Sequence, residues 1–417
     1  MPQAVPGDEV ELLVLKTNKN YGYAKIINII TPSELRVTPP CEHFAKCGGC
    51  QLMTIDYDAQ LDFKRNIVRD ALLRLGKIDS NPDIIASEKP IRYRNKMVFP
   101  FAPDGSWGFY RQRSHDVIPL SDCLLGDELV TRIMDTISNH IKKHNISVYD
   151  EASHKGIMRR AFLRTTDTEI MVVISANSDS IPKCAELIES ITAISPKISS
   201  IILNINKKRT NLVLGDKNVT LWGKDVLSAT LCGLAYEISP HSFFQVNPQQ
   251  TEKLYGKAIE FADITKDDTV LDIYCGIGTI SLTAAKSAKS VIGVEIVPEA
   301  IENAKENANR NGIDNAEFYC SAAEDIVPQL IADNISPDIV ILDPPRKGSD
   351  EKTLSAIVSA KPKRIVYVSC NPATLARDAM FLEQNGYTTK SVTAVDMFSH
   401  TVHVESVALF VQTDSSI

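Results

Sequence analysis

Cys370 stands where a thiol could do covalent chemistry. Residues 365–368 favour a buried strand, Pro372 cannot continue that strand, and residues 373–384 have the composition of a helix. Cys370 is therefore expected just beyond the carboxyl end of a strand, where ligands bind in open parallel sheets. A thiolate there could act as a nucleophile. A small buried side chain is an equal alternative, because free cysteine is among the most buried residue types.

Two carboxylates and two amides stand at comparable points of the chain. Asp343 ends an apolar run and is followed by two prolines, which place its carboxylate on a stiff loop, and Glu405 begins another apolar run. Either could be an acid or base at the same sheet edge, or an ordinary strand-end carboxylate. Gln245 and Asn247 lie in an aromatic, amide-rich linker and could contact a base edge or a cofactor. Capping of the next helix is the alternative for Asn247.

Residues 270–279 read as a strand that enters a glycine turn and opens a helix. The next strand ends in Glu295, 23 positions after Asp272. This pattern is typical of a nucleotide-binding βαβ unit, in which the acid binds ribose hydroxyls. No third glycine follows Gly278 at the expected spacing. The pattern therefore disfavours a nicotinamide dinucleotide and favours S-adenosylmethionine, which has a ribose and an adenine but no pyrophosphate.

Four cysteines could ligate a metal. Cys41, Cys47 and Cys50 have the spacing C-x5-C-x2-C on a glycine-bearing loop, and Cys123 is a fourth candidate farther along. Such a set can hold a [4Fe–4S] cluster or a zinc ion, and spacing alone does not choose between them. The chain has nine cysteines and no secretory signal is expected, which argues for ligation or catalysis before disulfides.

Composition indicates an ordinary globular protein of 417 residues with a formal net charge of -7. No apolar run approaches the ~20 residues of a membrane span, so we expect a cytoplasmic protein without membrane contact. Residues 1–250 hold 30 basic against 28 acidic side chains, whereas residues 251–417 hold 15 against 24. Basic residues with aromatic neighbours, which could bind RNA or be solvated surface, occur at 92–96, 109–113, 155–164 and 207–209.

The elements that position these residues fall into three parts, and together they predict an α/β protein. Residues 1–38 are expected to form a hairpin from a partial β-barrel, and residues 39–247 an α+β middle domain with the cysteine site. Residues 248–417 alternate strand and helix, which predicts a Rossmann-like domain with a mostly parallel sheet. A helix at 55–77 is expected to pack on that domain.

The spacing of apolar residues predicts individual helices. The long helix should place Leu61, Val68, Leu72 and Leu75 on one apolar face. The middle domain should contain helices at 126–143 and 182–194, and a helix should span 249–261.

Taken together, these motifs resemble the RNA uracil-C5 methyltransferase family, which forms 5-methyluridine in ribosomal and transfer RNA. The similarity runs from about Val5 to the end of the chain. The segments that carry it are residues 244–247, 272–278, 294–295, 343–345, 368–378 and 403–405. The family's N-terminal RNA-binding barrel, the TRAM domain, usually has more residues ahead of the position of Val5, so residues 1–38 are expected to form only its second half.

The resemblance implies roles for single residues. Cys370 would be the nucleophile and Glu405 the base that removes the C5 proton. The residues implied as S-adenosylmethionine contacts are Gln245, Tyr274, Glu295 and Asp343. Those implied as ligands of a [4Fe–4S] cluster, as in the ribosomal-RNA branch, are Cys41, Cys47, Cys50 and Cys123.

We therefore expect S-adenosylmethionine-dependent methyl transfer to C5 of a uridine in 23S ribosomal RNA, with no obligate protein partner. A transfer-RNA T-loop uridine is the alternative substrate, and an inactive RNA-binding iron–sulfur protein is the alternative of another class. The chemistry needs thiolate character at Cys370, which a polar turn beside a helix N-terminus should promote. Arg346, Lys347 and Arg377 flank the same edge and could hold phosphates.

Overall fold

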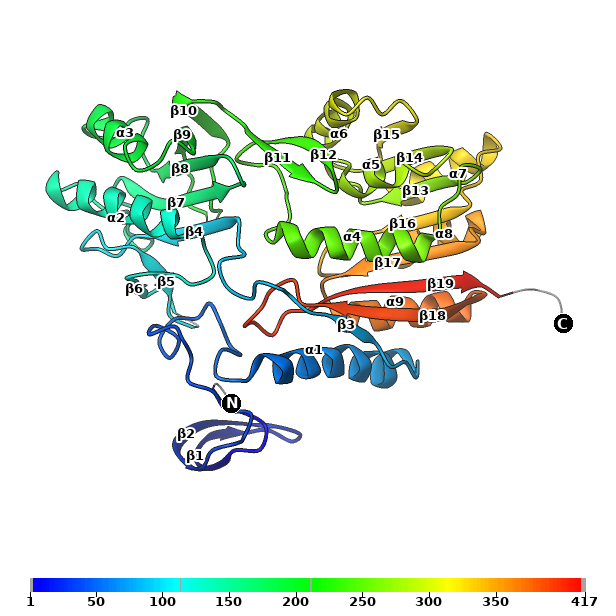
Figure 1. Ribbon diagram of the computed structural model, residues 1–417, viewed down its shortest axis with the longest axis horizontal. Coiled ribbons are helices and arrows are strands. Elements are labelled where there is room, and N and C mark those ends of the chain that lie inside the picture. The colour runs from blue at the N-terminus through cyan, green and yellow to red at the C-terminus, as the bar shows by residue number, and fades with distance from the viewer. Residues whose placement is uncertain (1–2, 113, 211, 414–417) are drawn as a thin grey trace. The chain divides into compact units, whose positions relative to one another are not determined.

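The computed structural model describes residues 3–112, 114–210 and 212–413, and the chain divides into two compact units (Figure 1). Unit 1 contains the residues up to Phe63, Lys89–Asp225 and Phe398–Val402. Unit 2 contains Lys64–Glu88, Val226–Met397 and the residues from His403 onward.

Unit 2 is built on a sheet of eight strands within the described residues. In spatial order the strands are β15 (Ala316–Cys320), β14 (Ser290–Glu295), β13 (Thr269–Ile273), β16 (Ile339–Leu342), β17 (Arg364–Ser369), β19 (Glu405–Gln412), β18 (Tyr387–Val395) and β3 (Asp83–Ile85). The five from β15 to β17 are parallel, and β19 lies antiparallel to both β17 and β18. The carboxyl ends of the parallel strands therefore share one edge, and β19 enters the sheet from that same edge.

Helices cover both faces of this sheet (Figure 1). The helices of unit 2 are the part of α1 (Tyr57–Ala71) from Lys64 onward, η1, a π-helix (Leu72–Gly76), α4 (Pro248–Ala262), α5 (Thr279–Ala285), α6 (Pro298–Arg310), α7 (Ala323–Ala332), α8 (Glu351–Ala360) and α9 (Pro372–Gln384). One core joins η1, α7, α8 and α9 to the inner strands, with Leu72, Tyr367 and Phe410 fully buried in it. Proline in the first turn and an asparagine N-cap fix the starts of α4 and α9. A short hairpin, β11 (Leu227–Leu231) with β12 (Leu234–Ile238), precedes α4.

Unit 1 has a five-stranded sheet among its described residues. In spatial order its strands are β10 (Lys217–Gly223), β9 (Ile198–Ile205), β8 (Ile170–Ala176), β7 (Met158–Thr165) and β4 (Lys96–Pro100). Helices α2 (Glu128–Lys143) and α3 (Cys184–Thr192) share the core of this sheet. Two hairpins complete the strands of the unit: β1 (Glu9–Thr17) with β2 (Gly22–Thr31), and β5 (Gly108–Tyr110) with β6 (Val117–Pro119).

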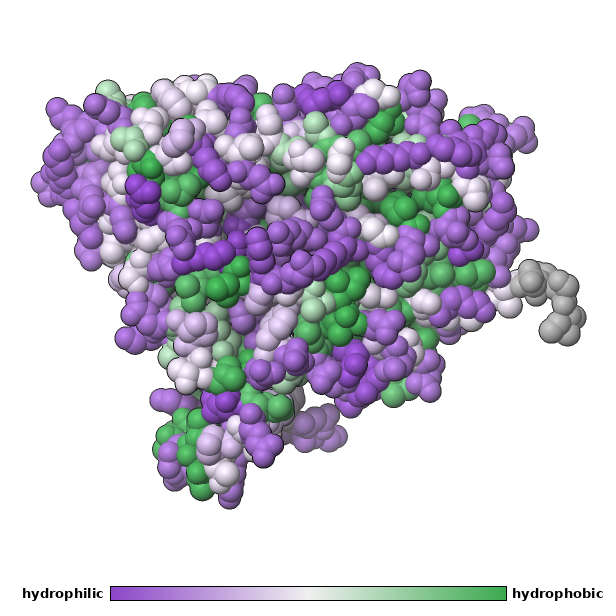
Figure 2. Space-filling view, in the orientation of Figure 1, coloured by the Kyte–Doolittle hydropathy of each residue, from purple (hydrophilic) through white to green (hydrophobic). Residues whose placement is uncertain are grey.

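The β1–β2 hairpin leaves many apolar side chains in water. Leu13, Val14, Leu15, Ile27 and Ile30 are all exposed, and Figure 2 shows hydrophobic patches on this hairpin. A two-stranded hairpin is too small to enclose a hydrophobic core by itself. The hairpin is therefore open, and its assignment to a partial barrel stays a prediction.

The predicted elements are confirmed at 126–143, 182–194 and 249–261, where α2, α3 and α4 lie. The long helix is α1 (Tyr57–Ala71), followed directly by η1. The expectation that Leu75 lies on the apolar face is wrong, because Leu75 is 52% exposed. A π turn has a wider repeat than an α-helix, so residues after Leu72 no longer follow the spacing of Val68 and Leu72, which are buried.

Among the described residues, none of the helices has the length and apolar character needed to cross a bilayer.

Candidate active site

Cys370 lies in the one-residue gap between the end of β17 and the Asn371 cap of α9. Asn371 accepts a hydrogen bond from the Ala373 N–H at 3.1 Å, which stops the strand and starts the helix. Its Nδ2 donates to the Arg346 carbonyl at 3.0 Å. The turn that carries Cys370 is thereby tied to the loop after β16, which carries Asp343.

Strand register places Glu405 opposite Cys370. The last residue pair between the antiparallel strands β17 and β19 is Ser369 with Ser406. One step outward on each strand gives Cys370 and Glu405, so the thiol and the carboxyl emerge side by side at the sheet edge. Glu405 is 4% exposed, and burial, together with the nearby carboxyl of Asp343, raises its pKa well above the usual range. Such a carboxylate binds a proton readily.

The surroundings of Cys370 favour the neutral thiol over the thiolate. Burial is the main reason, and the carboxyls of Glu405 and Asp343 add to it, so that the pKa of Cys370 is raised to about 11. The guanidinium of Arg346 acts in the opposite direction on both Cys370 and Glu405. We expected a polar turn beside a helix N-terminus to promote a thiolate, but burial and two neighbouring acids outweigh that effect on the pKa of Cys370.

Acidic side chains gather at the ends of β13, β14 and β16. Burial raises the pKa of Asp343 to about 7. Asp272 also has a pKa of about 7, raised by burial and by the carboxyls of Asp343 and Glu295, although it accepts a hydrogen bond from Ser281 at 2.5 Å. Acids that repel one another in a poorly solvated site favour a cationic ligand. The sulfonium of S-adenosylmethionine is such a cation.

The turn after β13 is shaped for a ligand. Tyr274 has a φ of 67°, and Gly276 and Gly278 also have positive φ values. A side chain at Gly278 would strain this backbone and meet the Phe318 ring at 3.2 Å. The Gly276 N–H donates to the Glu295 carboxylate at 3.3 Å, which fixes the acid beside the turn.

Gln245 and Asn247 differ in role. Asn247 accepts from the Gln250 N–H at 3.3 Å as the N-cap of α4 and donates to the Met397 carbonyl at 3.1 Å, so its capping role is confirmed. Gln245 is hydrogen-bonded to the Tyr255 hydroxyl, which lies near Asp343. The structure therefore brings Gln245 to the edge where Asp343 lies.

One hydrogen-bond network at this site was not foreseen. Asp378 accepts hydrogen bonds from the Tyr367 hydroxyl at 2.6 Å and from the Ser349 N–H at 2.9 Å. The Ser349 hydroxyl in turn contacts the Tyr274 hydroxyl at 3.1 Å. The network links the glycine turn to the helix after Cys370. The sequence held a signal for this network, because Asp378 stands on the mostly apolar inner face of α9. A buried acid needs hydrogen-bond partners.

Several basic residues that the sequence left open as RNA contacts or solvated surface make contacts within the protein instead. Arg377 donates to the carbonyls of Lys347 and Ser349, which steadies the loop that also carries Arg346. In unit 1, Arg159 and Arg164 are only 4% exposed. Arg159 donates to three backbone carbonyls, so it is committed within the protein.

The four predicted cysteine ligands come together in unit 1. Cys41, Cys47, Cys50 and Cys123 line one cavity of about 200 Å³ whose other walls are mostly apolar, with Arg94 and Lys96 among them. The Gly49 N–H donates to the Cys47 sulfur at 3.4 Å.

The distances between the four cysteine sulfurs bear on whether a zinc ion or a [4Fe–4S] cluster fits this cavity. In the described part of the chain no three of the four sulfurs lie within 4.8 Å of one another. Zinc with bonds of about 2.3 Å would hold its sulfurs about 3.8 Å apart. The basic neighbours and mostly apolar walls are compatible with an anionic [4Fe–4S] cluster, and the choice between zinc and the cluster stays a prediction.

Comparisons with known proteins agree with this arrangement. A family model described as tRNA (Uracil-5-)-methyltransferase matches residues 56–413. A protein of Clostridium tetani named as an uncharacterized RNA methyltransferase is 48% identical over 412 residues, 97% of this chain and 90% of that protein. A similarly named protein of Halalkalibacterium halodurans is 45% identical and covers 98% of this chain and 91% of its own length.

A solved structure is similar over almost the whole chain. It is Pyrococcus abyssi tRNA (uracil-54, C5)-methyltransferase in complex with S-adenosyl-L-homocysteine. The TM-score is 0.80 at 28% sequence identity, and the match covers 98% of this chain and 94% of that chain. The α/β fold with its Rossmann-like domain is thereby confirmed.

Proposed function

This chain belongs to the tRNA (uracil-5-)-methyltransferase family of S-adenosylmethionine-dependent enzymes, and we propose that it methylates C5 of a uridine in 23S ribosomal RNA through a covalent bond from Cys370. The observation that carries the proposal is the pairing of Ser369 with Ser406, which sets Cys370 and Glu405 side by side. A nucleophile and a base at one sheet edge are what this reaction requires.

The first step activates the ring. Uracil C5 is a poor nucleophile, so the Cys370 sulfur bonds to C6 and the C5–C6 electron pair moves into an enolate over C5, C4 and O4. The thiol must give up its proton for this step, and the adjacent Arg346 guanidinium favours the thiolate. The target base must leave its stack or loop to reach the sulfur of Cys370.

The second step transfers the methyl group. S-adenosylmethionine supplies an activated methyl group, which C5 takes up while the electron pair of the broken bond stays on the donor sulfur. Gln245, Tyr274, Glu295 and Asp343 would hold this donor. Glu405 then removes the C5 proton, the C5–C6 double bond re-forms, and the C6–sulfur bond breaks to release Cys370. The raised pKa of Glu405 suits it to accept that proton.

Two RNA classes compete as substrate. The four-cysteine site supports ribosomal RNA, since the resemblance to the ribosomal branch includes these ligands. The Pyrococcus abyssi structure, a tRNA (uracil-54, C5)-methyltransferase, favours a transfer-RNA uridine as second candidate. Purified holoenzyme should be given each RNA with radiolabelled S-adenosylmethionine, and the product nucleotide mapped. Methyl transfer to 23S RNA supports the proposal, and transfer to transfer RNA alone overturns it.

An inactive RNA-binding protein is the remaining alternative. It predicts that the wild-type holoenzyme binds both RNAs without forming 5-methyluridine in either. Formation of 5-methyluridine that is lost in Cys370→Ala and kept in Cys184→Ala would exclude it. Cys184 is a suitable control because it lies at the start of α3 in unit 1, outside the residues assigned to chemistry.

We also propose that Cys41, Cys47, Cys50 and Cys123 hold a [4Fe–4S] cluster with a structural role. Four protein thiolates leave no iron position open for substrate. Protein purified without oxygen should be brown and contain about four irons and four sulfides per chain. Stoichiometric zinc without visible absorbance would overturn the cluster.

A further inference from the structure

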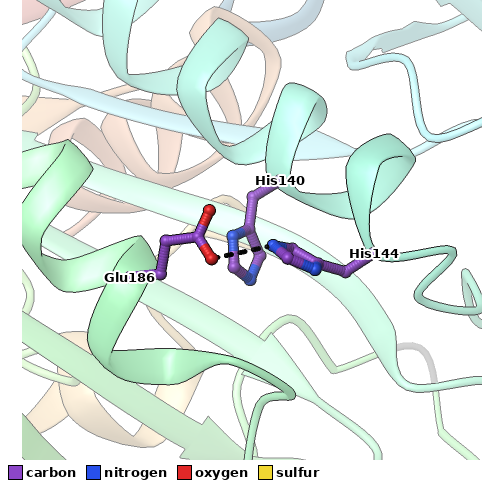
Figure 3. Close-up of side chains that lie close together, drawn as sticks. All are labelled: His140, His144 and Glu186. Carbon is purple, nitrogen blue, oxygen red and sulfur yellow. Dashed lines mark ion pairs between the residues drawn. The ribbon is translucent and has the colours of Figure 1, made fainter.

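A second group of metal-ligand side chains lies in unit 1, at the meeting of α2 and α3. His140 is in the last turn of α2, His144 is its C-cap, and Glu186 is in the first turn of α3. One ligand atom from each residue lies within 4.8 Å of the other two. Figure 3 shows the three side chains converging from the two helices.

The two histidines are spaced for joint ligation. Residues four apart share one face of a helix, which is how paired histidines bind zinc in helical sites. Their ring centroids are 4.6 Å apart. His140 is 6% exposed, and its Nε2 lies 3.0 Å from the Pro182 carbonyl oxygen. That oxygen can only accept, so Nε2 carries the hydrogen and Nδ1 keeps a lone pair. A metal-binding histidine is commonly oriented by such a hydrogen bond from its other nitrogen.

The contact between His144 and Glu186 has the spacing of two ligands. His144 Nε2 lies 3.2 Å from Glu186 Oε2, a distance at which a protonated imidazole forms an ion pair with the carboxylate and at which a neutral imidazole can share a metal ion with it. Tetrahedral zinc with bonds of about 2.0–2.1 Å separates its ligand atoms by about 3.3 Å. A metal ion would replace this ion pair by binding the neutral imidazole nitrogen and the carboxylate oxygen directly. The other carboxylate oxygen of Glu186 is paired with Lys143, which leaves Oε2 for the metal.

We propose that His140, His144 and Glu186 bind one divalent transition-metal ion, with Zn²⁺ as the chemically preferred ion and water in the fourth position. Two imidazoles and one carboxylate are a standard zinc donor set. The ion would join the end of α2 to the start of α3. Because Glu186 is partly exposed, the site is open to metal from solution.

Cobalt provides a direct test on the cluster-loaded, oxygen-free protein. Co²⁺ at this site should show ligand-field absorption without the thiolate charge-transfer bands of cysteine ligation, at one ion per chain. Glu186→Gln and His144→Ala should each weaken binding by at least about tenfold. Glu189→Gln is the matched control, because Glu189 is exposed one turn along the same helix and should leave binding unchanged.

Thermal unfolding gives a second readout for variants that fold poorly. Zn²⁺ should raise the melting temperature of the wild type and of Glu189→Gln, and leave that of Glu186→Gln unchanged. Equal Co²⁺ affinity in all variants, binding with thiolate bands only, or no Zn²⁺ effect on the wild type would each overturn the site. None of these readouts depends on methyl transfer.

Discussion

Replacing Glu405 with glutamine should stop the reaction after the methyl group has been transferred. Glutamine keeps the shape of the side chain and removes the group that accepts the C5 proton. A general base contributes about 10²–10⁴-fold to a rate, or about 3–5 kcal/mol of barrier. Glu405 is 4% exposed, so water has little room to replace the carboxylate, and we expect a kcat loss near the upper end of that range.

The same substitution should help the first step. The Glu405 carboxyl raises the pKa of the Cys370 thiol, so its removal should bring that pKa down from about 11. Glu405→Gln should therefore react faster than wild type with iodoacetamide at a fixed mildly alkaline pH. The covalent enzyme–RNA complex should accumulate instead of product.

The assay follows methylated RNA and the denaturant-resistant protein–RNA complex in the same samples. Glu302→Gln, an exposed acid on α6, is the control and should match wild type. Turnover by Glu405→Gln within about tenfold of wild type would refute the assignment of the base. Loss of turnover without any accumulated complex would instead place Glu405 before the methyl transfer.

Three other perturbations have expected outcomes. Lys64→Met should lower the free energy of unfolding by about 3–5 kcal/mol in urea titrations, because Lys64 and Asp396 form a 2.5 Å ion pair in which each side chain is 1% exposed. The double variant Lys64→Met/Asp396→Leu should recover much of this loss. Asp343 and Asp272 ionise near pH 7, so S-adenosylmethionine should bind more tightly in equilibrium dialysis as the pH rises through about 7. The pKa values of both carboxyls are higher in the folded than in the unfolded protein, so the ligand-free protein should lose stability as the pH rises from about 4 to about 7. Thermal melts measure this loss, and constant stability over that range would contradict these pKa values. Cys50→Ser should lose most of the iron and the brown colour, and full iron content by chemical analysis would count against Cys50 as a ligand.

Local sequence patterns predicted much of the fold because strands and helices leave short-range signals. Pro372 and the apolar run before it were enough to place Cys370 at a strand end, since proline has no N–H to donate to the hydrogen-bond ladder of a central strand. Local patterns could not predict that Cys370 and Glu405 lie side by side. It depends on β19 pairing antiparallel to β17 in one register, which is a property of the whole sheet.

Burial and electrostatics could not be read from the sequence. Arg159 and Arg164 stand among basic residues, yet their side chains are buried in unit 1. The pKa of Cys370 is raised mainly by burial and further by carboxyls that are distant in sequence, and neither effect can be seen in the local turn. Metal-ligand spacing at His140 and His144 was visible in the sequence, but their partner on α3 lies 42 positions beyond His144 and only the packed structure reveals it.

The central claim is that the sulfur of Cys370 bonds to C6 of the target uracil. RNA containing 5-fluorouridine tests it most directly, because fluorine at C5 cannot leave as the proton does and the enzyme stays attached. Incubation with S-adenosylmethionine should give a denaturant-resistant complex whose modified peptide contains Cys370. The complex should be absent in Cys370→Ala and present in Cys184→Ala. A complex that persists in Cys370→Ala, or a wild-type enzyme that makes 5-methyluridine but never forms the complex, would contradict the account.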